Sequence, residues 1–143
     1  MSFKALKIRI KKNEGFSKTP YKDQLGFYTI GYGHLIKTHE KNYFNKKYNK
    51  KHFEELFQLD FQNAVNQYEK LFTKAKHNNN DKELLIEMLF QLGPKGVLGF
   101  KKMLFYLEKK KKYMVCFEMM NSLWYKQTPN RVEDIINNFI KKK

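Results

Sequence analysis

Apolar side chains recur every three or four residues along most of this chain, which is the spacing of one face of an α-helix. The longest such run covers residues 51–76, and its apolar positions are Phe53, Leu56, Phe57, Phe61, Ala64, Val65, Tyr68, Leu71, Phe72 and Ala75. The run predicts one amphipathic helix of about 40 Å, at about 1.5 Å per residue. We interpret its aromatic stripe as core, and a helix of this length could connect two lobes.

Shorter runs with the same spacing predict an opening helix to about Asn13 and further helices at 82–92, 99–108, 111–124 and 129–140. The segment 78–81 reads NNND and predicts a helix break followed by a cap. Pro129 suits the first turn of a helix, and the glycines and proline of 93–96 predict a turn.

The pattern changes between Gly26 and Leu35, where aromatic or β-branched residues alternate with glycine. This alternation is typical of a twisted β-hairpin and would place Thr29 on a strand. Many helices with one small hairpin predict an α+β, mostly α-helical fold.

Two acidic residues stand out near this hairpin. Glu14 and Asp23 are the only acids among the first 39 residues, and lysines surround them. Hydrolysis of a glycosidic bond uses one carboxylic acid to protonate the leaving oxygen and a second group to deliver water. Asp is also common in turns, so spacing alone leaves open that Glu14 is a helix-end charge and Asp23 a turn residue.

Longer motifs favour the chemical interpretation. Residues 14–15, 21–23, 26–35 and 124–131 read EG, YKD, GFYTIGYGHL and WYKQTPNR, and 88–93 and 96–100 read MLFQLG and GVLGF. This pattern, over residues 3–140, resembles the phage-type lysozymes of glycoside hydrolase family 24. The family motif E-x8-D-x5-T falls on Glu14, Asp23 and Thr29.

The resemblance implies a single domain, 1–143, with a two-lobed lysozyme-like fold and a saccharide groove between the lobes. Residues 14–50 would form a small β-containing lobe and 51–76 the connecting helix. Residues 77–143, together with 1–13, would form a helical C-terminal lobe.

The resemblance also implies roles for individual residues. Glu14 would be the general acid, Asp23 the base or electrostatic stabiliser, and Thr29 the hydroxyl that holds the attacking water. The positions expected to bind substrate are Leu35, Phe90, Met103 and Glu118, of which the last two depart from the polar groups that the family can present.

Two further residues match supporting positions. Arg131 matches a position near the catalytic glutamate, where its planar fork could bind a carboxylate, although a surface charge at a helix start is the alternative. His34 is expected to make a structural hydrogen bond at a strand end.

The activity implied is hydrolysis of the β-1,4 bond between N-acetylmuramic acid and N-acetylglucosamine, with cell-wall lysis as its result and peptidoglycan glycan strands as partner. If the reaction inverts configuration, the carboxyl groups should lie roughly 6.5–9.5 Å apart. The alternatives are a lytic transglycosylase, against which Asp23 and Thr29 argue, and a catalytically silent wall-binding protein.

The net charge of +15 raises the question of a nucleic-acid partner. Only two of the 29 basic residues, Arg9 and Arg131, are arginines, whereas recognition of phosphates and bases more often uses arginine. AT-rich coding accounts for much of the lysine, and attraction to an anionic envelope is a second explanation. We therefore expect no specific nucleic-acid partner.

The remaining composition suggests a reducing compartment. Cys116 is the single cysteine and lies in an apolar stretch, so we expect a small core residue. The four histidines show no metal-ligand spacing, and we expect no metal or other cofactor. No apolar run has signal-peptide or membrane-spanning length. We expect a monomer without membrane insertion, held in a host bacterial cytoplasm until a holin-type helper gives it access to the wall.

Overall fold

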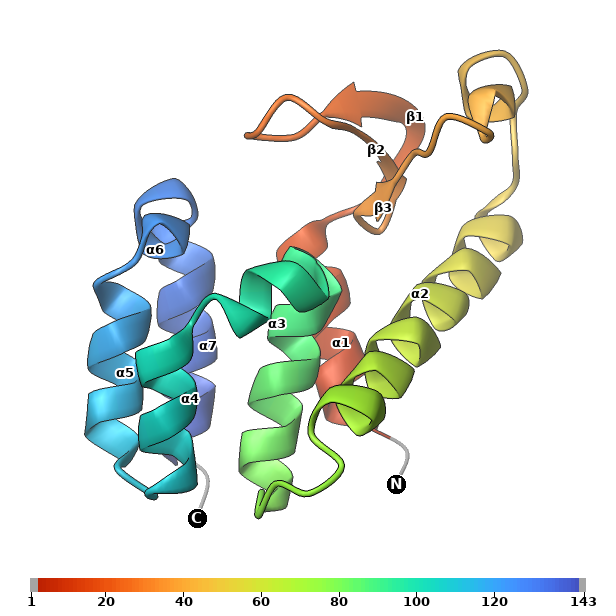
Figure 1. Ribbon diagram of the computed structural model, residues 1–143. Coiled ribbons are helices and arrows are strands. Elements are labelled where there is room, and N and C mark those ends of the chain that lie inside the picture. Colours follow the sequence, from red (N-terminus) through yellow and green to blue (C-terminus); the bar gives the residue numbers. More distant parts are fainter. Residues whose placement is uncertain (1–2, 142–143) are drawn as a thin grey trace. The chain divides into compact units, whose positions relative to one another are not determined.

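The computed structural model describes residues 3–141, which form seven α-helices, one short 3-10 helix and a three-stranded sheet (Figure 1). The expected α+β, mostly helical fold is confirmed. The chain divides into two compact units, Met1–Asn63 and Ala64–Lys143. Residues 1–2 and 142–143, which the expected domain includes, lie outside the described part.

In the first unit, helix α1 (Lys4–Glu14) packs against the early part of α2 (Lys50–Leu71). Leu6 and Ile10 are the buried side chains of α1. The Phe3 ring lies 5.8 Å from that of Phe61, and Lys11 forms an ion pair with Glu54. These contacts place α1 in the first unit, whereas the expected lobes grouped residues 1–13 with the helical lobe.

The sheet of this unit is antiparallel, in the order β1 (Ser17–Lys22), β2 (Tyr28–Gly31) and β3 (His34–Leu35). The expected hairpin is confirmed as β2 and β3. Strand β1 was not expected, because its residues show no clear alternation and include Pro20. The pairing of β1 with β2 is irregular between Ser17 and Tyr21, as expected near a residue that has no N–H to donate.

One face of the sheet closes a small core. Ile30 from β2 packs with Tyr43 of the 3-10 helix η1 (Lys41–Phe44) and with Phe53 of α2. Because side chains alternate along a strand, Ile30 and Thr29 point to opposite faces. The face that carries Thr29 is therefore not the face that packs on this core.

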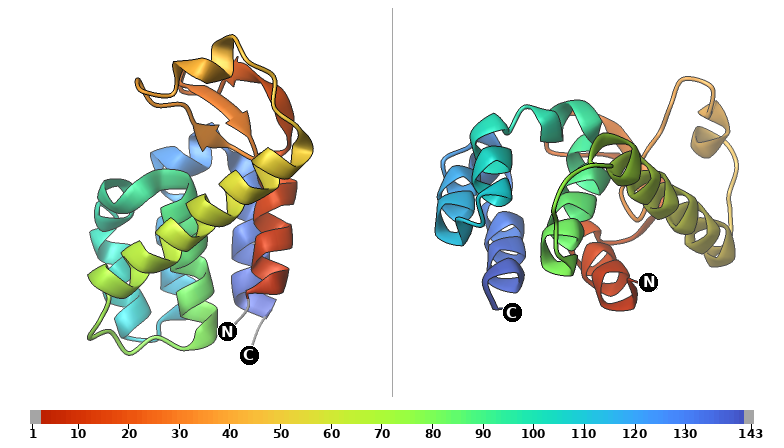
Figure 2. Two further views of the ribbon diagram at one scale, coloured as in Figure 1. Left: turned by 90° about the vertical axis from the view of Figure 1, so that its right-hand side faces the viewer. Right: turned by 60° about the horizontal axis from the view of Figure 1, so that its bottom comes forward.

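The second unit contains α3 (Asn79–Leu98), α4 (Lys101–Glu108), α5 (Lys112–Met120), α6 (Leu123–Gln127) and α7 (Pro129–Lys141). Helix α5 packs beside α4 and beside α7, and the three helices lie together in Figure 1; Figure 2 shows two further views. The expected cap before α3 is confirmed as a capping box, in which Asn78 and Asp81 bond to each other's backbone N–H.

The helices differ from those expected at three main points, apart from shifts of a few residues at other ends. Helix α2 ends at Leu71 instead of 76, and the Thr73 hydroxyl donates to the Glu69 carbonyl, 2.6 Å away, in place of a continuing backbone bond. The expected turn at 93–96 is a kink at Gly93, with φ 74° and ψ 172°, after which helix continues to Leu98. The expected helix at 111–124 is two helices, because the Ser122 hydroxyl accepts the Tyr125 N–H and starts α6.

Candidate active site

The three residues expected to carry the chemistry, Glu14, Asp23 and Thr29, all lie in the first unit. Glu14 is the last residue of α1, Asp23 follows β1 directly, and Thr29 lies within β2. Two lie at the ends of regular elements and one within a strand, so ordered backbone positions each of them.

The Glu14 carboxylate lies against the backbone of Gly33, in the turn between β2 and β3. A Cβ placed on Gly33 would lie 2.4 Å from Glu14 Oε1 and 2.7 Å from its Cδ. Gly33 also has a φ of 76°, which L side chains rarely adopt. Glycine at this position thus makes room for the carboxylate and permits the turn. The Glu14 side chain is partly exposed, so a solute can reach it.

The Asp23 carboxylate is held by the backbone of its own turn. Oδ1 accepts the N–H groups of Leu25 and Phe27, each at 2.9 Å. The Asp23 N–H donates to the Phe27 carbonyl at 2.8 Å, and its carbonyl accepts from Gly26 at 3.0 Å. Oδ2 takes no part in these bonds. One oxygen therefore orients the carboxylate, and the other remains available for a water molecule.

Thr29 is buried, with 5% of its surface exposed, and its Oγ1 donates to the Tyr21 carbonyl at 3.3 Å. The register pairs Thr29 with Tyr21 on β1 and with Leu35 on β3. Residues directly opposite each other share a face of a sheet, so the three side chains form one row. The Leu35 end of this row is half exposed, which is suitable for contact with a ligand.

His34 is buried between two carboxylates. Its Nδ1 lies 2.8 Å from Asp60 Oδ2, and its Nε2 lies 3.0 Å from Glu40 Oε1. Burial by itself lowers the pKa of His34, but the two carboxylates outweigh it and the pKa is raised. The pKa of Glu40 is lowered: burial opposes this change, and the Lys37 backbone N–H and His34 outweigh it. His34 thereby ties β3 to α2 and to the segment before η1.

The residues beside the turn that contains Gly33 were not expected from the sequence. The Tyr32 hydroxyl donates to Glu54 Oε1 at 2.7 Å, and Lys11 lies 5.0 Å above the Tyr32 ring. Burial, followed by the neighbouring Glu54, raises the pKa of Tyr32 to about 12. The triplet Gly31-Tyr32-Gly33 was a visible signal, but its partners on α1 and α2 are remote in sequence.

The other expected site residues lie in the second unit. Phe90 on α3, Glu118 on α5 and Arg131 on α7 are each partly buried. Met103 on α4 is completely buried, so it has no surface with which to touch a sugar. The Trp124 indole donates to Gln91 Oε1 at 3.0 Å, which joins α6 to the helix that carries Phe90.

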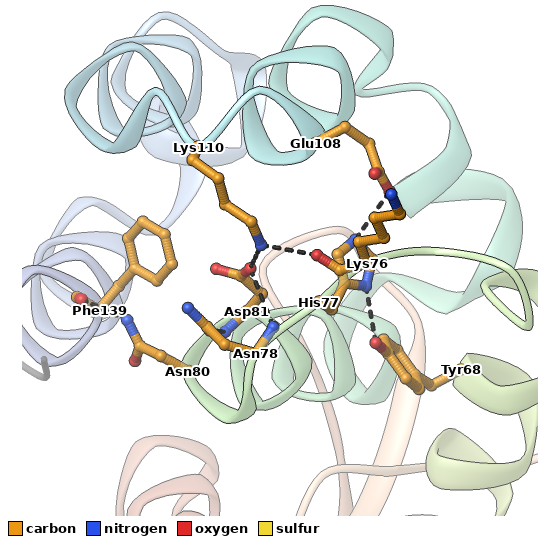
Figure 3. A network of polar contacts seen from close by, with 9 residues as sticks. All are labelled: Tyr68, Lys76, His77, Asn78, Asn80, Asp81, Glu108, Lys110 and Phe139. Atoms are coloured by element: carbon orange, nitrogen blue, oxygen red, sulfur yellow. Dashed lines mark hydrogen bonds and ion pairs between the residues drawn. The ribbon is translucent and has the colours of Figure 1, made fainter.

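A polar network in the second unit joins the start of α3 to the end of α4 (Figure 3). Lys110 donates to the Lys76 carbonyl at 2.6 Å and to Asp81 Oδ2 at 2.8 Å. His77 lies 2.6 Å from the Tyr68 hydroxyl and 3.3 Å from Glu108 Oε1. Burial lowers the pKa of His77 in spite of nearby Glu108. All these groups are paired within the network, so we interpret it as structural.

Comparison with known proteins identifies the family of the chain. A family model described as phage lysozyme matches residues 11–138. The chain belongs to the phage lysozyme family. Two curated relatives, both from the amoeba Dictyostelium discoideum, are "Probable T4-type lysozyme 2" and "Probable T4-type lysozyme 1". The first is 37% identical over 94% of this chain and 93% of its own, and the second 35% identical over 93% and 92%.

A member of this family is a glycosidase of the lysozyme type, and the family implies peptidoglycan as its substrate. Between residues 3 and 141, no three His, Cys, Asp or Glu side chains gather where they could hold a metal ion. Within the same range, no helix combines the length and apolar character required to cross a bilayer. Cys116 is buried, and burial raises the pKa of its thiol.

Proposed function

We propose that this lysozyme is a muramidase that hydrolyses the β-1,4 bond between N-acetylmuramic acid and N-acetylglucosamine in peptidoglycan, with Glu14 as its acid. The observation that carries the proposal is the close approach of the Glu14 carboxylate to Gly33. The partly exposed Glu14 thus has a defined position in the unit that also contains Asp23 and Thr29.

In this mechanism Glu14 protonates the glycosidic oxygen as the bond to the anomeric carbon breaks. Asp23 stabilises or activates the water that completes the reaction, and Thr29 helps to hold that water. Three features support these roles: Asp23 Oδ1 is occupied by two backbone donors, Oδ2 is not, and the Thr29 hydroxyl is fixed on a strand. An inverting reaction is part of the proposal.

Leu35 and Phe90 are the proposed sugar contacts, and the half-exposed side chain of Leu35, in the same row as Thr29, supports its role. Glu118 is proposed as a sugar contact because of the family resemblance. Arg131 and His34 are proposed as supporting residues. The burial of Met103 argues against direct contact, so we propose that Met103 acts only through packing.

The test compares wild type with Glu14→Gln on purified peptidoglycan. Wild type should clear the suspension and release free reducing ends, and Glu14→Gln should lose roughly 100-fold or more of the rate, as expected for an essential general acid. An anhydro product without reducing ends would instead identify a lytic transglycosylase. Binding without clearing would identify a silent wall-binding protein.

The biological setting is a separate proposal. An endolysin would act as a monomer released from a bacterial cytoplasm with the help of a holin. The two relatives named above come from an amoeba and not from a phage. Wall cleavage by the purified protein tests the enzyme, and expression in bacteria with and without a holin tests the setting.

A further inference from the structure

Helix α5 is apolar on two opposite faces. Val115, Cys116 and Met119 are buried in the second unit. Tyr113, Met114, Phe117 and Met120 point the other way, with between 39% and 75% of their surface exposed. We call these four residues the outer face of α5. A helix at a protein surface normally presents polar residues on its outer side, and α5 has only Lys112 and Glu118 as charged residues, so its open apolar face is unusual.

The outer face is a continuous stripe. At 3.6 residues per turn, Tyr113, Phe117 and Met120 fall within an arc of about 60°. Leu123, at the start of the next helix, is also exposed at 67%. Single apolar residues on a surface are ordinary, but a contiguous group of this kind marks a binding surface.

Lysines outnumber acids in the segment of the chain that carries this stripe. Residues 95–126 include two acids, Glu108 and Glu118, and eight lysines: Lys95, Lys101, Lys102, Lys109, Lys110, Lys111, Lys112 and Lys126. Four of the lysines, 109–112, immediately precede the outer face. Lys110 is bound to Asp81 and Lys112 to the Ile140 carbonyl. Lys101, Lys102, Lys111 and Lys126 are exposed.

An apolar helical face with aromatic residues, flanked by lysines, matches the surface of an anionic bilayer. The apolar side chains enter the boundary between headgroups and acyl chains, and lysines interact with anionic headgroups. A second copy of the chain is a poor match, because two such faces would bring like charges together. Helix α5 is far shorter than the roughly 20 residues that a spanning helix needs, so contact would be peripheral.

We propose that the outer face of α5, together with Leu123 and the surrounding lysines, docks the protein on the surface of an anionic lipid bilayer. The outer face includes none of Glu14, Asp23 and Thr29, although α5 also carries Glu118, a proposed sugar contact. Docking on a bilayer does not depend on the proposed cleavage of peptidoglycan. Docking would add to muramidase activity a means of keeping the protein at a bacterial envelope.

The experiment is co-sedimentation with vesicles of phosphatidylglycerol and phosphatidylcholine in equal parts, and with vesicles of phosphatidylcholine alone. Wild type should bind the anionic vesicles and bind the neutral ones much more weakly. Tyr113→Ser/Phe117→Ser should weaken the binding roughly tenfold or more, because two apolar insertions are lost. Lys109→Gln/Lys111→Gln should weaken it by a similar factor.

Leu59→Ser is the matched control, because Leu59 is 69% exposed on α2 and lies outside this surface. It should bind as wild type does, and so should Glu14→Gln, whatever its activity. Phe117→Trp keeps the site apolar, and its fluorescence should shift to the blue on anionic vesicles. This variant keeps the test valid if the double serine variant does not fold.

Three results would overturn the proposal. Wild type could fail to bind anionic vesicles, or the double serine variant could bind like wild type, in which case general positive charge suffices. The third is a wild-type dimer in sedimentation velocity that Tyr113→Ser/Phe117→Ser dissociates, without vesicle binding by the wild type. That result would make the outer face a contact between copies.

Discussion

The Glu14 carboxylate occupies the space in which residue 33 would carry a Cβ. An added Cβ on Gly33 would approach Oε1 to 2.4 Å, closer than Cβ atoms come to any neighbour, and φ at Gly33 is 76°. The proposed acid can therefore occupy this position because residue 33, two residues after β2, has no side chain. Any side chain at 33 must displace either the carboxylate or the turn.

Gly33→Ala should therefore reduce activity at least tenfold and lower the free energy of unfolding by about 1–2 kcal/mol. Peptidoglycan clearing and thermal melting measure the two effects. Gly93→Ala is the matched control: Gly93 also has positive φ, but nothing lies within 4 Å of an added Cβ. It should lose stability and retain activity below its melting temperature. Full activity in Gly33→Ala would contradict the close contact.

Substitution of Asp23 can distinguish the effect of its charge from the effect of its hydrogen bonds in the turn. Asp23→Asn keeps an oxygen that can accept from Leu25 and Phe27 but removes the charge. It should lose roughly 100-fold in rate and melt near the wild-type temperature. Asp23→Ala should lose as much rate and about 1 kcal/mol of stability besides, because the turn loses its acceptor. If Asp23→Asn keeps its activity, Asp23 is only a turn residue, the alternative that its sequence position left open.

The Thr29 hydroxyl can be tested with two conservative changes. Thr29→Ser keeps the donor to the Tyr21 carbonyl and should retain most activity. Thr29→Val keeps the shape but leaves that carbonyl without its hydroxyl partner, which should cost about 1 kcal/mol. We also expect it to lose roughly tenfold or more in activity, measured as reducing ends released. Equal rates in the two variants would remove Thr29 from the mechanism.

The raised pKa of His34 predicts that the stability of the folded protein depends on pH. Its pKa is raised above the ordinary 6.5 in the folded protein, so its contribution is complete below 6.5 and is lost as pH rises through the folded pKa. The pKa of Glu40 is lowered from 4.5, so its contribution is complete above 4.5 and is lost as pH falls through the folded value. The cluster of His34, Glu40 and Asp60 should therefore stabilise the folded state most between pH 4.5 and pH 6.5.

His34→Gln removes the charge from this cluster. At a pH of about 5.5 it should cost about 3 kcal/mol, because two partly buried carboxylates lose their partner. The difference from wild type should shrink as pH rises through the folded pKa of His34, above which His34 is neutral in both the folded and the unfolded state. Denaturant unfolding at several pH values measures the difference in stability between His34→Gln and wild type. If that difference does not vary with pH, a charged His34 does not stabilise the cluster.

Much of the architecture was predictable because it depends on local pattern. Three- and four-residue spacing located most of the helices, and glycine alternation located β2 and β3. Strand β1 was missed because Ser17–Lys22 is polar and is held mainly by pairing with β2. The break between α5 and α6 depends on one hydroxyl, Ser122, which spacing does not reveal.

The site was predictable in part. The family pattern identified Glu14, Asp23 and Thr29, and their roles stay predictions. The partners of His34 could not be foreseen, since Asp60 is 26 residues away and several other acids were equally plausible. The burial of Met103 could not be foreseen either, because a Met within an amphipathic run can face either side of its helix.

The two buried histidines respond to acid in opposite directions. His77 has a lowered pKa, so its unfolded state binds a proton more readily and its unit loses stability as pH falls below 6.5. The stabilisation of the first unit by His34 is instead gained as pH falls through its raised folded pKa, and it is complete below 6.5. Hydrogen exchange at two pH values would follow each unit separately. Mild acid should thus weaken the unit that contains His77 and leave the contribution of His34 to the unit with the proposed catalytic residues intact, so a change in pH redistributes stability within one short chain.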